Sequence, residues 1–456
     1  MSSPIEYAYN NRSNHLAELF EFLRIPSVST QPGHKEDTAR AAAWLTESMK
    51  RIGLENVHTF ATDRHPLVYA DWLHAGPEAP TVLVYGHYDV QPPEPLELWD
   101  SPPFEPVIRD DYVYARGSSD DKGQVYIHIK AAEAYLKANG RLPVNLKFII
   151  EGEEEIGSEG LHKFIPQHRD LLAADSALVS DTAMLGRGKP ALVYGLRGNC
   201  HILVDITGPG RDLHSGTYGG GINNPLNAMS HLIARLKDER GHILIPGFYD
   251  RVRPLTVGER ELLANFPLDE AAWLVETGAP EIWGEPEYSL VERISARPTL
   301  DVTGLIGGYT GEGTKTVLPS HAHAKISMRL VPDQDPKEIA ELFQQFARSI
   351  LPPSVKVTMR GGGSKPALID RDTPPMRAAA AAYEATFHHP AVFMREGGSI
   401  PVVNQFESDL KLPTVLMGFG LPGDHIHSPN ERFYVPNFFA GIETSIRYLE
   451  LLRQTE

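Results

Sequence analysis

The chain has 456 residues, of which 41% are hydrophobic and 22% charged, which is an ordinary globular composition and enough length for two or three domains. Its formal net charge of −16 argues against nucleic-acid binding, because that binding draws most of its affinity from basic surface. The single cysteine, Cys200, excludes an intrachain disulfide, and the absence of a secretory-signal pattern or of about 18 consecutive apolar residues predicts a cytoplasmic protein with no membrane partner.

The first third of the chain alternates between helical and strand patterns. Apolar residues at helical spacing predict helices over residues 14–25, 38–52 and 123–138. Short apolar runs predict buried strands over residues 81–85, 145–150 and 176–180. Because strands alternate with helices, we expect an α/β sheet that is mostly parallel in its core.

Glycine clusters then mark a change of pattern in the middle of the chain. Between the clusters at 208–210 and 361–363, the sequence predicts a helix over 225–236, a long irregular stretch over 241–298, a strand over 321–330, a helix over 336–350 and a strand over 355–359. The earlier pattern resumes with strands over 391–394 and 414–417 and helices over 376–387 and 437–452. We therefore predict an α/β domain in two pieces, 1–197 and 364–456, interrupted by an α+β insertion over 198–363.

The first candidate for metal chemistry is the segment TVLVYGHYDVQP, in which His87 and Asp89 follow the predicted strand 81–85. Residues two apart in extended chain point to the same side, so the aspartate can hold one imidazole nitrogen and orient the other toward a metal. The alternative is a loop histidine that only hydrogen-bonds to a nearby aspartate. This motif alone does not decide between the two.

Four further segments place carboxylates or histidines at predicted strand ends or in loops. They are RGSSDDKG (116–123), EGEEEIGSEG (151–160), SALVSDTA with Asp181, and GLPGDHIHSPNE (420–431). The aspartate pair in the first of these also fits a solvated helix cap. In open α/β sheets, however, ligands gather at the carboxyl ends of strands. Mixed histidine and carboxylate donors suit Zn²⁺, Mn²⁺ or Co²⁺, and their number fits two metal ions roughly 3.5–4 Å apart.

Eight segments in order resemble the M20 metallopeptidase family, most nearly its cytosolic non-specific dipeptidase and carnosinase branch. They are GHYDVQP, RGSSDDKG, EEIGSEG, SD at 180–181, YGLRG (194–198), RDLHSG (211–216), REGGSIP (395–401) and HSPNE (427–431). The resemblance implies a two-domain fold, in which an α/β, phosphorylase/hydrolase-like metallopeptidase catalytic domain carries an inserted α+β lid and dimerisation domain. It also implies two divalent metal ions per subunit, Zn²⁺ or Mn²⁺.

The same resemblance implies a role for each matched residue of the metal site. Asp120 bridges the two metals, and Glu154 is the general base. The terminal ligands are His87 and Asp181 on one metal, and Glu155 and His427 on the other. Asp89 clamps His87 from behind, and the Asp120-Asp121 peptide is cis. Since the run holds three glutamates in succession, a slip of one residue in the alignment would make Glu153 the base instead.

The resemblance further implies a homodimer in which His214 of the partner subunit stabilises the oxyanion. Thr316, Arg329, Gly398 and Ser399 match positions that bind the substrate, and Arg329 suits its carboxylate because a guanidinium binds a carboxylate through two parallel hydrogen bonds.

The predicted activity is hydrolysis of dipeptides, and two classes of alternative stay open. One is an N-acyl-amino-acid deacylase, of succinyl-diaminopimelate or acetylornithine type, or a carboxypeptidase with the same metal site. The other is a non-catalytic protein that uses this fold for binding or assembly. Three histidines, His321, His323 and His425, are read as non-ligands, and Cys200 as a small core residue. The native metal and the preferred dipeptide are left undecided by the sequence.

Overall fold

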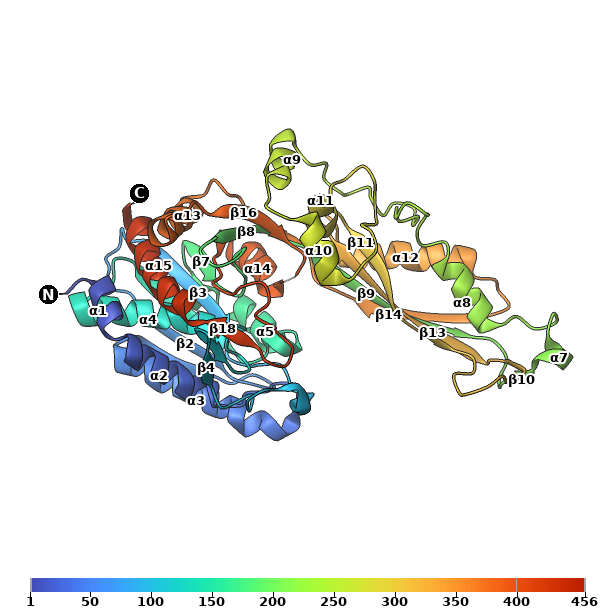
Figure 1. Ribbon diagram of the computed structural model, residues 1–456, viewed down its shortest axis with the longest axis horizontal. Coiled ribbons are helices and arrows are strands. Elements are labelled where there is room, and N and C mark those ends of the chain that lie inside the picture. The colour runs from blue at the N-terminus through green and yellow to red at the C-terminus, as the bar shows by residue number, and fades with distance from the viewer. Residues whose placement is uncertain (1, 399, 455–456) are drawn as a thin grey trace. The chain divides into compact units, whose positions relative to one another are not determined.

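The computed structural model describes residues 2–398 and 400–454, which form two compact units. Unit 1 contains the chain up to Tyr194, Ile369–Met394 and the chain from Val402 onward, whereas unit 2 contains Gly195–Leu368 and Arg395–Pro401. Figure 1 colours both units by residue number. The division into domains at residues 197/198 and 363/364 stays a prediction.

The strands of unit 1 form a mixed sheet in the order β1-β2-β6-β3-β7-β17-β8. Their bounds are β1 (Glu55–Phe60), β2 (Leu67–Trp72), β3 (Thr81–His87), β6 (Asn145–Glu151), β7 (Ser176–Val179), β8 (Ala191–Leu196) and β17 (Thr414–Leu416). The four central strands β6, β3, β7 and β17 are parallel, whereas β2 and β8 pair antiparallel at either side. The expectation of a sheet with a parallel core is therefore confirmed. A small sheet of β4 (Val107–Arg109), β5 (Tyr112–Tyr114) and β18 (Arg432–Tyr434) lies apart from it.

Helices cover the main sheet of unit 1. They are α1 (Pro4–Asn10), α2 (Arg12–Leu23), α3 (Lys35–Ile52), α4 (Lys122–Asn139), α5 (Glu159–Gln167), α6 (Arg169–Leu172), α13 (Pro374–Phe387), α14 (Pro401–Gln405) and α15 (Val435–Gln454). Along β6, Leu146 and Phe148 belong to the hydrophobic core shared with α3, α4 and α15, which are labelled in Figure 1. Lys147 points to the opposite face, where its Nζ donates to the carbonyls of Leu171 and Ala173. This alternation is the two-residue period of a strand covered on both faces.

Helix α4 is central to unit 1 because it is buried along most of its length. It packs against β3, α1, α2, α3 and α15. A helix covered on all sides needs mostly apolar or small residues, which predominate from Val125 to Ala138. Its buried polar residues have partners: His128 hydrogen-bonds to Ser180 and Ser445, and Lys130 pairs with Glu18 and Glu133. The helix ends at Gly140, whose φ of 67° is the left-handed conformation that glycine adopts without strain. Its first turn follows directly on the Asp120-Asp121 pair.

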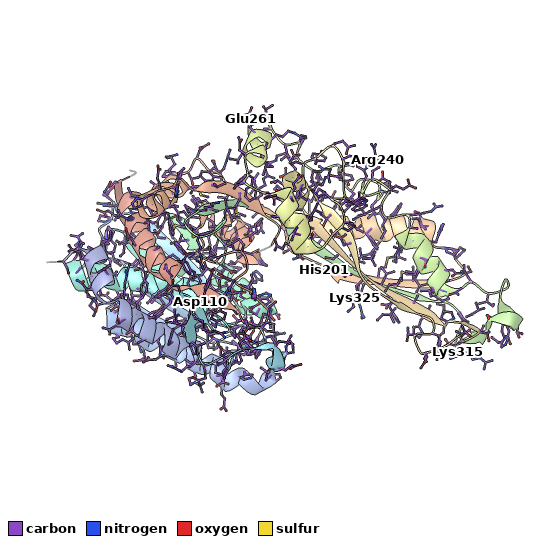
Figure 2. All side chains as sticks on the ribbon, viewed as in Figure 1. Asp110, His201, Arg240, Glu261, Lys315 and Lys325 are labelled. Atoms are coloured by element: carbon purple, nitrogen blue, oxygen red, sulfur yellow. The ribbon has the colours of Figure 1, made fainter. Side chains whose placement is uncertain are left out.

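Unit 2 is built on a four-stranded antiparallel sheet with the order β11-β13-β9-β14. The four strands are β9 (Gly198–Thr207), β11 (Thr299–Gly307), β13 (His321–Leu330) and β14 (Lys356–Gly362). The short strands β10 (Leu213–His214) and β12 (Val317–Leu318) form a separate pair, and β15 (Ala367–Leu368) and β16 (Val392–Glu396) pair with β8. Helices α8 (Pro225–Ile233) and α12 (Pro336–Ile350) share a hydrophobic core with one sheet face, to which Cys200 contributes as predicted. The other face carries exposed polar residues, including His201 and Lys325, which are labelled in Figure 2.

The prediction of an irregular stretch over 241–298 is wrong. That segment contains α9 (Val257–Ala264), α10 (Glu270–Thr277) and α11 (Leu290–Ser295), and the short α7 (Ser215–Tyr218) precedes it. The signal that could have found two of these helices is a capping box. Thr256 with Glu259, and Ser289 with Glu292, each satisfy two free backbone N–H groups at a helix start. Among the described residues, none of the helices combines the length and hydropathy needed to cross a bilayer.

His15 in α2 predicts a pH-dependent stability of unit 1. It is 1% exposed, and neither ring nitrogen has a hydrogen-bond partner among the described residues. Burial, followed by the charge of Lys130, lowers its pKa to about 4. The imidazole therefore becomes protonated near pH 6.5 in the unfolded chain but only near pH 4 in the folded chain. The free energy of unfolding consequently decreases as the pH falls from about 6.5 toward 4. Between pH 7 and pH 5 we expect a loss of about 2 kcal/mol from this group.

The measurement is the free energy of unfolding in urea at pH 7 and pH 5, for the wild type and for His15→Leu. Other titrating groups contribute equally to both proteins, so the difference between the two isolates His15. A variant whose stability depends on pH as steeply as the wild type would contradict the assignment.

Candidate metal centre

His87 is the last residue of the central strand β3 and is fully buried. Its Nδ1 lies 3.0 Å from the carbonyl oxygen of Asp89 and 3.5 Å from the Asp89 carboxylate. That carboxylate also accepts the backbone N–H groups of Glu154 and Glu155, at 3.2 and 3.1 Å. Asp89 thus joins the ends of the neighbouring strands β3 and β6. With Nδ1 facing Asp89, the Nε2 of His87 faces the other side chains of the site.

The glycine before His87 is required by a close approach of helix α4. A Cβ at Gly86 would lie 2.5 Å from Val125 Cγ2 and 2.7 Å from Asp121 Oδ2. With no side chain there, Asp121 Oδ2 accepts the backbone N–H of His87 at 3.1 Å. The Asp120-Asp121 peptide is cis, as predicted. The hydrogen bond between Asp121 and the backbone of His87 holds the start of α4 against the end of β3, and so Asp120 lies next to His87.

Asp120 lies between two histidines that are far apart in the sequence. Its Oδ1 is 3.0 Å from His87 Nε2, and its Oδ2 is 2.9 Å from His427 Nε2. His427 Nε2 is also 3.4 Å from Glu155 Oε2. The donor atoms form two groups, each with all its atoms within 4.8 Å of one another: His87, Asp120 and Asp181, and Asp120, Glu155 and His427. Asp120 is the member that both groups share.

The chemistry of these donors fits divalent cations. His87 Nε2 is buried and makes no hydrogen bond with any described residue, although Asp120 Oδ1 lies within reach. Glu155 Oε1 is also buried without a partner, while Gln91 holds the other oxygen of Glu155 at 2.6 Å. Buried lone pairs that converge without hydrogen bonds are costly unless a cation accepts them. Imidazole and carboxylate donors in this mixture suit Zn²⁺ or Mn²⁺.

The three successive glutamates have different surroundings. Glu153 is 1% exposed, and its carboxylate accepts the backbone N–H groups of His65 and Gly160 at 3.0 Å each, as well as the hydroxyl of Thr62. Its oxygens are therefore occupied by structural hydrogen bonds. Glu154 is partly buried, and no described residue makes a hydrogen bond to its carboxylate. Of these two, Glu154 has the side chain that is free to exchange a proton.

Carboxylates concentrate negative charge around this centre. Burial raises the pKa of Glu154 well above its usual range, and the charges of Asp181 and Glu155 act in the same direction. Hydrogen bonds to Asp120 and Glu155 raise the pKa of His427 to about 10. Burial and the neighbouring carboxylates disfavour the ionised form of Glu154, while the carboxylates favour the protonated form of His427. Bound cations would offset this negative charge.

Comparison with known proteins identifies the family. The model of peptidase family M20/M25/M40 matches residues 83–451. The chain belongs to this family. A Cys-Gly metallodipeptidase of Candida albicans is 33% identical over 95% of this chain and 93% of its own, and a Beta-Ala-His dipeptidase of Mus musculus is 32% identical over 85% and 80%. The crystal structure of an M20 family metallo-carboxypeptidase from Sulfolobus solfataricus is 31% identical, has a TM-score of 0.86, and covers 96% of this chain and 99% of its own.

Membership in the M20 family confirms several predictions at once. The resemblance to its dipeptidase and carnosinase branch, the two-domain α/β fold class and the enzyme class of metallopeptidase are all confirmed. A divalent metal cofactor follows from membership in the family. The individual roles predicted for the site residues stay predictions.

The remaining predicted site residues that the structure describes lie in unit 2. His214 is exposed at the end of β10, where its Nδ1 accepts the backbone N–H of Gly216 at 3.0 Å. Thr316 is its neighbour, since the Thr316 carbonyl accepts the backbone N–H of Ser215 at 3.1 Å. Arg329 is partly buried on β13, and Gly398 follows β16. The prediction for Ser399 lies outside the described residues.

Arg197 is a residue of unit 2 to which the sequence reasoning gave no role. Two of its guanidinium nitrogens, Nε and Nη1, are buried without a hydrogen-bond partner among the described residues. Burial, together with the charge of Arg329, lowers its pKa to about 10. Its position in the YGLRG motif was the only signal in the sequence. Arg197 and Arg329 thus lie close enough for their charges to interact, and guanidiniums suit a carboxylate ligand.

His321, His323 and His425 belong to neither of the two donor groups found among the described residues, and their reading as non-ligands stays a prediction. The ring centroids of His321 and His323 are 5.0 Å apart on the exposed face of the unit 2 sheet. On the same face, the Asp205 carboxylate hydrogen-bonds to His323. His425 is exposed on the loop that carries His427.

Proposed function

We propose that this M20 family member is a dipeptidase that binds two divalent cations, Zn²⁺ or Mn²⁺, through His87, Asp120, Glu155, Asp181 and His427. The observation that carries the proposal is the position of Asp120, whose two carboxylate oxygens face His87 and His427. A carboxylate shared in this way is what a two-metal hydrolase needs to hold its ions a short distance apart.

The proposed mechanism assigns the proton transfers to Glu154. When bound, the two cations would supply Lewis acidity and lower the pKa of the attacking water. Glu154 accepts a proton from that water as its oxygen bonds to the scissile carbonyl carbon. It then donates the proton to the amine nitrogen as the C–N bond breaks. Asp89 holds His87 in position, and His214 of the partner subunit stabilises the oxyanion, so we propose that the active form is a homodimer.

The proposed substrates are dipeptides with a free carboxylate. The printed names of the relatives are Cys-Gly metallodipeptidase and Beta-Ala-His dipeptidase, so both dipeptides are candidates for this chain. We propose that Thr316, Arg329, Gly398 and Ser399 bind the substrate, with Arg329 on its carboxylate. The cationic pair of Arg329 and Arg197 supports this role.

A carboxypeptidase is the second candidate, because the structure of an M20 family metallo-carboxypeptidase is 31% identical to this chain. An N-acyl-amino-acid deacylase is a third possibility, with the same metal site. The three functions differ in what occupies the amino side of the scissile bond: a single residue, a longer peptide or an acyl group.

A substrate panel separates these candidates. The panel holds Cys-Gly, β-Ala-His, several α-dipeptides, tripeptides and N-acetyl amino acids, each tested after chelation and reloading with Zn²⁺ or with Mn²⁺. We expect kcat/KM for the best dipeptide to exceed that for its N-acetyl analogue by about 100-fold or more, because a site built to bind an amino group is left unpaired by an acyl group. Preferred hydrolysis of the N-acetyl amino acids, or of the longer peptides, would replace dipeptidase by one of the alternatives.

A further inference from the structure

Glu431 is a fully buried carboxylate at the end of the loop that carries His427. All four of its side-chain hydrogen bonds come from N–H donors in one segment, residues 116–120. Its Oε1 accepts the backbone N–H groups of Ser119 and Asp120, at 2.9 and 3.1 Å. Its Oε2 accepts the backbone N–H of Gly117 at 2.9 Å and Nη1 of the buried Arg116 at 2.8 Å. Glu431 belongs to neither of the two donor groups of the metal centre.

These hydrogen bonds connect the two loops that bring Asp120 and His427 together. The segment 116–120 lies between β5 and α4, and no strand or helix pairing supports it. The chain around Glu431 is anchored, because its carbonyl accepts the N–H of Ala115 at 3.1 Å and the next residue, Arg432, begins β18, which pairs with β5. Glu431 is therefore a fixed point from which the backbone of the 116–120 segment is held.

The connection matters because the position of Asp120 relative to His427 depends on how the two loops that carry them are held. The side chain of His427 is 54% exposed, so packing does little to fix it. The backbone N–H of Asp120 donates to Glu431 Oε1, while its two carboxylate oxygens face His87 and His427. A shift of the 116–120 segment would therefore move the shared carboxylate relative to both histidines.

We propose that Glu431 is a positioning residue that sets where the shared carboxylate of Asp120 stands relative to His427, and thereby the spacing of the two metal ions. The inference rests on the proposed two-metal function. It predicts that changing Glu431 weakens the binding of both ions, although within the two donor groups the Glu431 side chain contacts only the backbone N–H of Asp120 and none of the donor atoms.

Glu431→Gln is the informative variant because it keeps the shape of the side chain. Each carboxylate oxygen accepts two N–H donors, so the amide nitrogen introduced by glutamine faces two donors at whichever position it takes. The variant should bind both metal ions with dissociation constants raised roughly 10- to 100-fold, the usual effect of losing a group that orients a metal ligand. Isothermal titration calorimetry of the metal-free protein with Mn²⁺ alone measures these dissociation constants.

Asp424→Asn is a matched control on the same loop. Asp424 is 3% exposed and its Oδ2 accepts the hydroxyl of Ser119 at 3.0 Å and the backbone N–H of Leu421 at 2.7 Å. It contacts the same segment, but through a side chain and not through the backbone of the shared ligand. We expect its Mn²⁺ dissociation constants to stay close to those of the wild type.

A second readout does not depend on affinity or on turnover. At saturating Mn²⁺, the electron paramagnetic resonance spectrum reports the spin coupling between two ions that share a bridging ligand. Glu431→Gln should change this coupling, and Asp424→Asn should leave it as in the wild type. Circular dichroism of the metal-free proteins checks that both variants are folded.

The outcomes separate this inference from the function on which it rests. If the wild type binds fewer than two metal ions, the proposed two-metal function itself is wrong. A wild type with two coupled ions, together with a folded Glu431→Gln of unchanged affinity and coupling, overturns the role of Glu431 alone. If Glu431→Gln does not fold, Glu431→Asp decides: it keeps the charge beside Arg116 but withdraws the carboxylate from the segment. Weakened Mn²⁺ binding in that variant supports the inference, and wild-type binding overturns it.

Discussion

Glu154→Gln should lower kcat by roughly 10²- to 10⁴-fold, the usual contribution of a general acid–base group, while leaving the metal content unchanged. The glutamine cannot accept a proton from water, but it keeps the shape of the side chain. The Glu154 carboxylate has no hydrogen-bond partner among the described residues, so the substitution breaks no hydrogen bond of the fold. The measurements are steady-state kinetics with the best dipeptide and metal analysis of the purified variant.

Glu153→Gln is the matched control, because it changes the neighbouring carboxylate in the same way. Glu153 accepts hydrogen bonds from Thr62, His65 and Gly160, so its loss should lower the free energy of unfolding. We expect this variant to unfold at lower temperature and to retain much of its turnover. If Glu154→Gln kept near wild-type turnover and Glu153→Gln lost it while folded, the base would be Glu153.

Asp120→Ala should abolish the binding of both metal ions and bring turnover to background. The reason is that Asp120 is the one residue common to both donor groups found among the described residues. Removing it takes an oxygen from each group and leaves His87 and His427 without the carboxylate between them. The wild type should gain about 2.7 kcal/mol of stability for each site when free metal is 100 times its dissociation constant. The variant should gain nothing.

Asp181→Ala is the comparison for this experiment, because Asp181 belongs to one donor group only. The substitution should weaken the binding of one metal ion and leave the affinity for the other unchanged. Metal titration followed by thermal unfolding distinguishes the two variants. Equal and partial losses in both would show that Asp120 is not shared, and the two-metal proposal would then fail.

Much of the scaffold could be read from local pattern. The strand predicted at 321–330 is β13 with the same bounds, and the predicted helix 336–350 is α12. Strand β3 could be recognised because a strand covered on both faces must be apolar throughout. The end of α3 could be recognised from Gly53, because glycine readily adopts the left-handed conformation that follows a helix, and its φ is 108° here. Prediction failed at α9 to α11, which are short and bury few residues, so their apolar periodicity is weak.

The sequence by itself determined which residue types follow the parallel strands, and hence that His87, Asp181 and the glutamates at 153–155 lie at one edge of the sheet. Only the tertiary structure decided which of them meet. His427 lies 307 residues from Asp120, so their contact depends on how two irregular loops are held, and Glu431 supplies the hydrogen bonds between those loops. The same holds for the adjacent glutamates: Glu153 and Glu154 are identical as letters, and they differ because the fold surrounds one carboxylate with N–H donors and leaves the other without them. A hydrogen-bonding environment is built by residues distant in the chain, so no local pattern could have shown it.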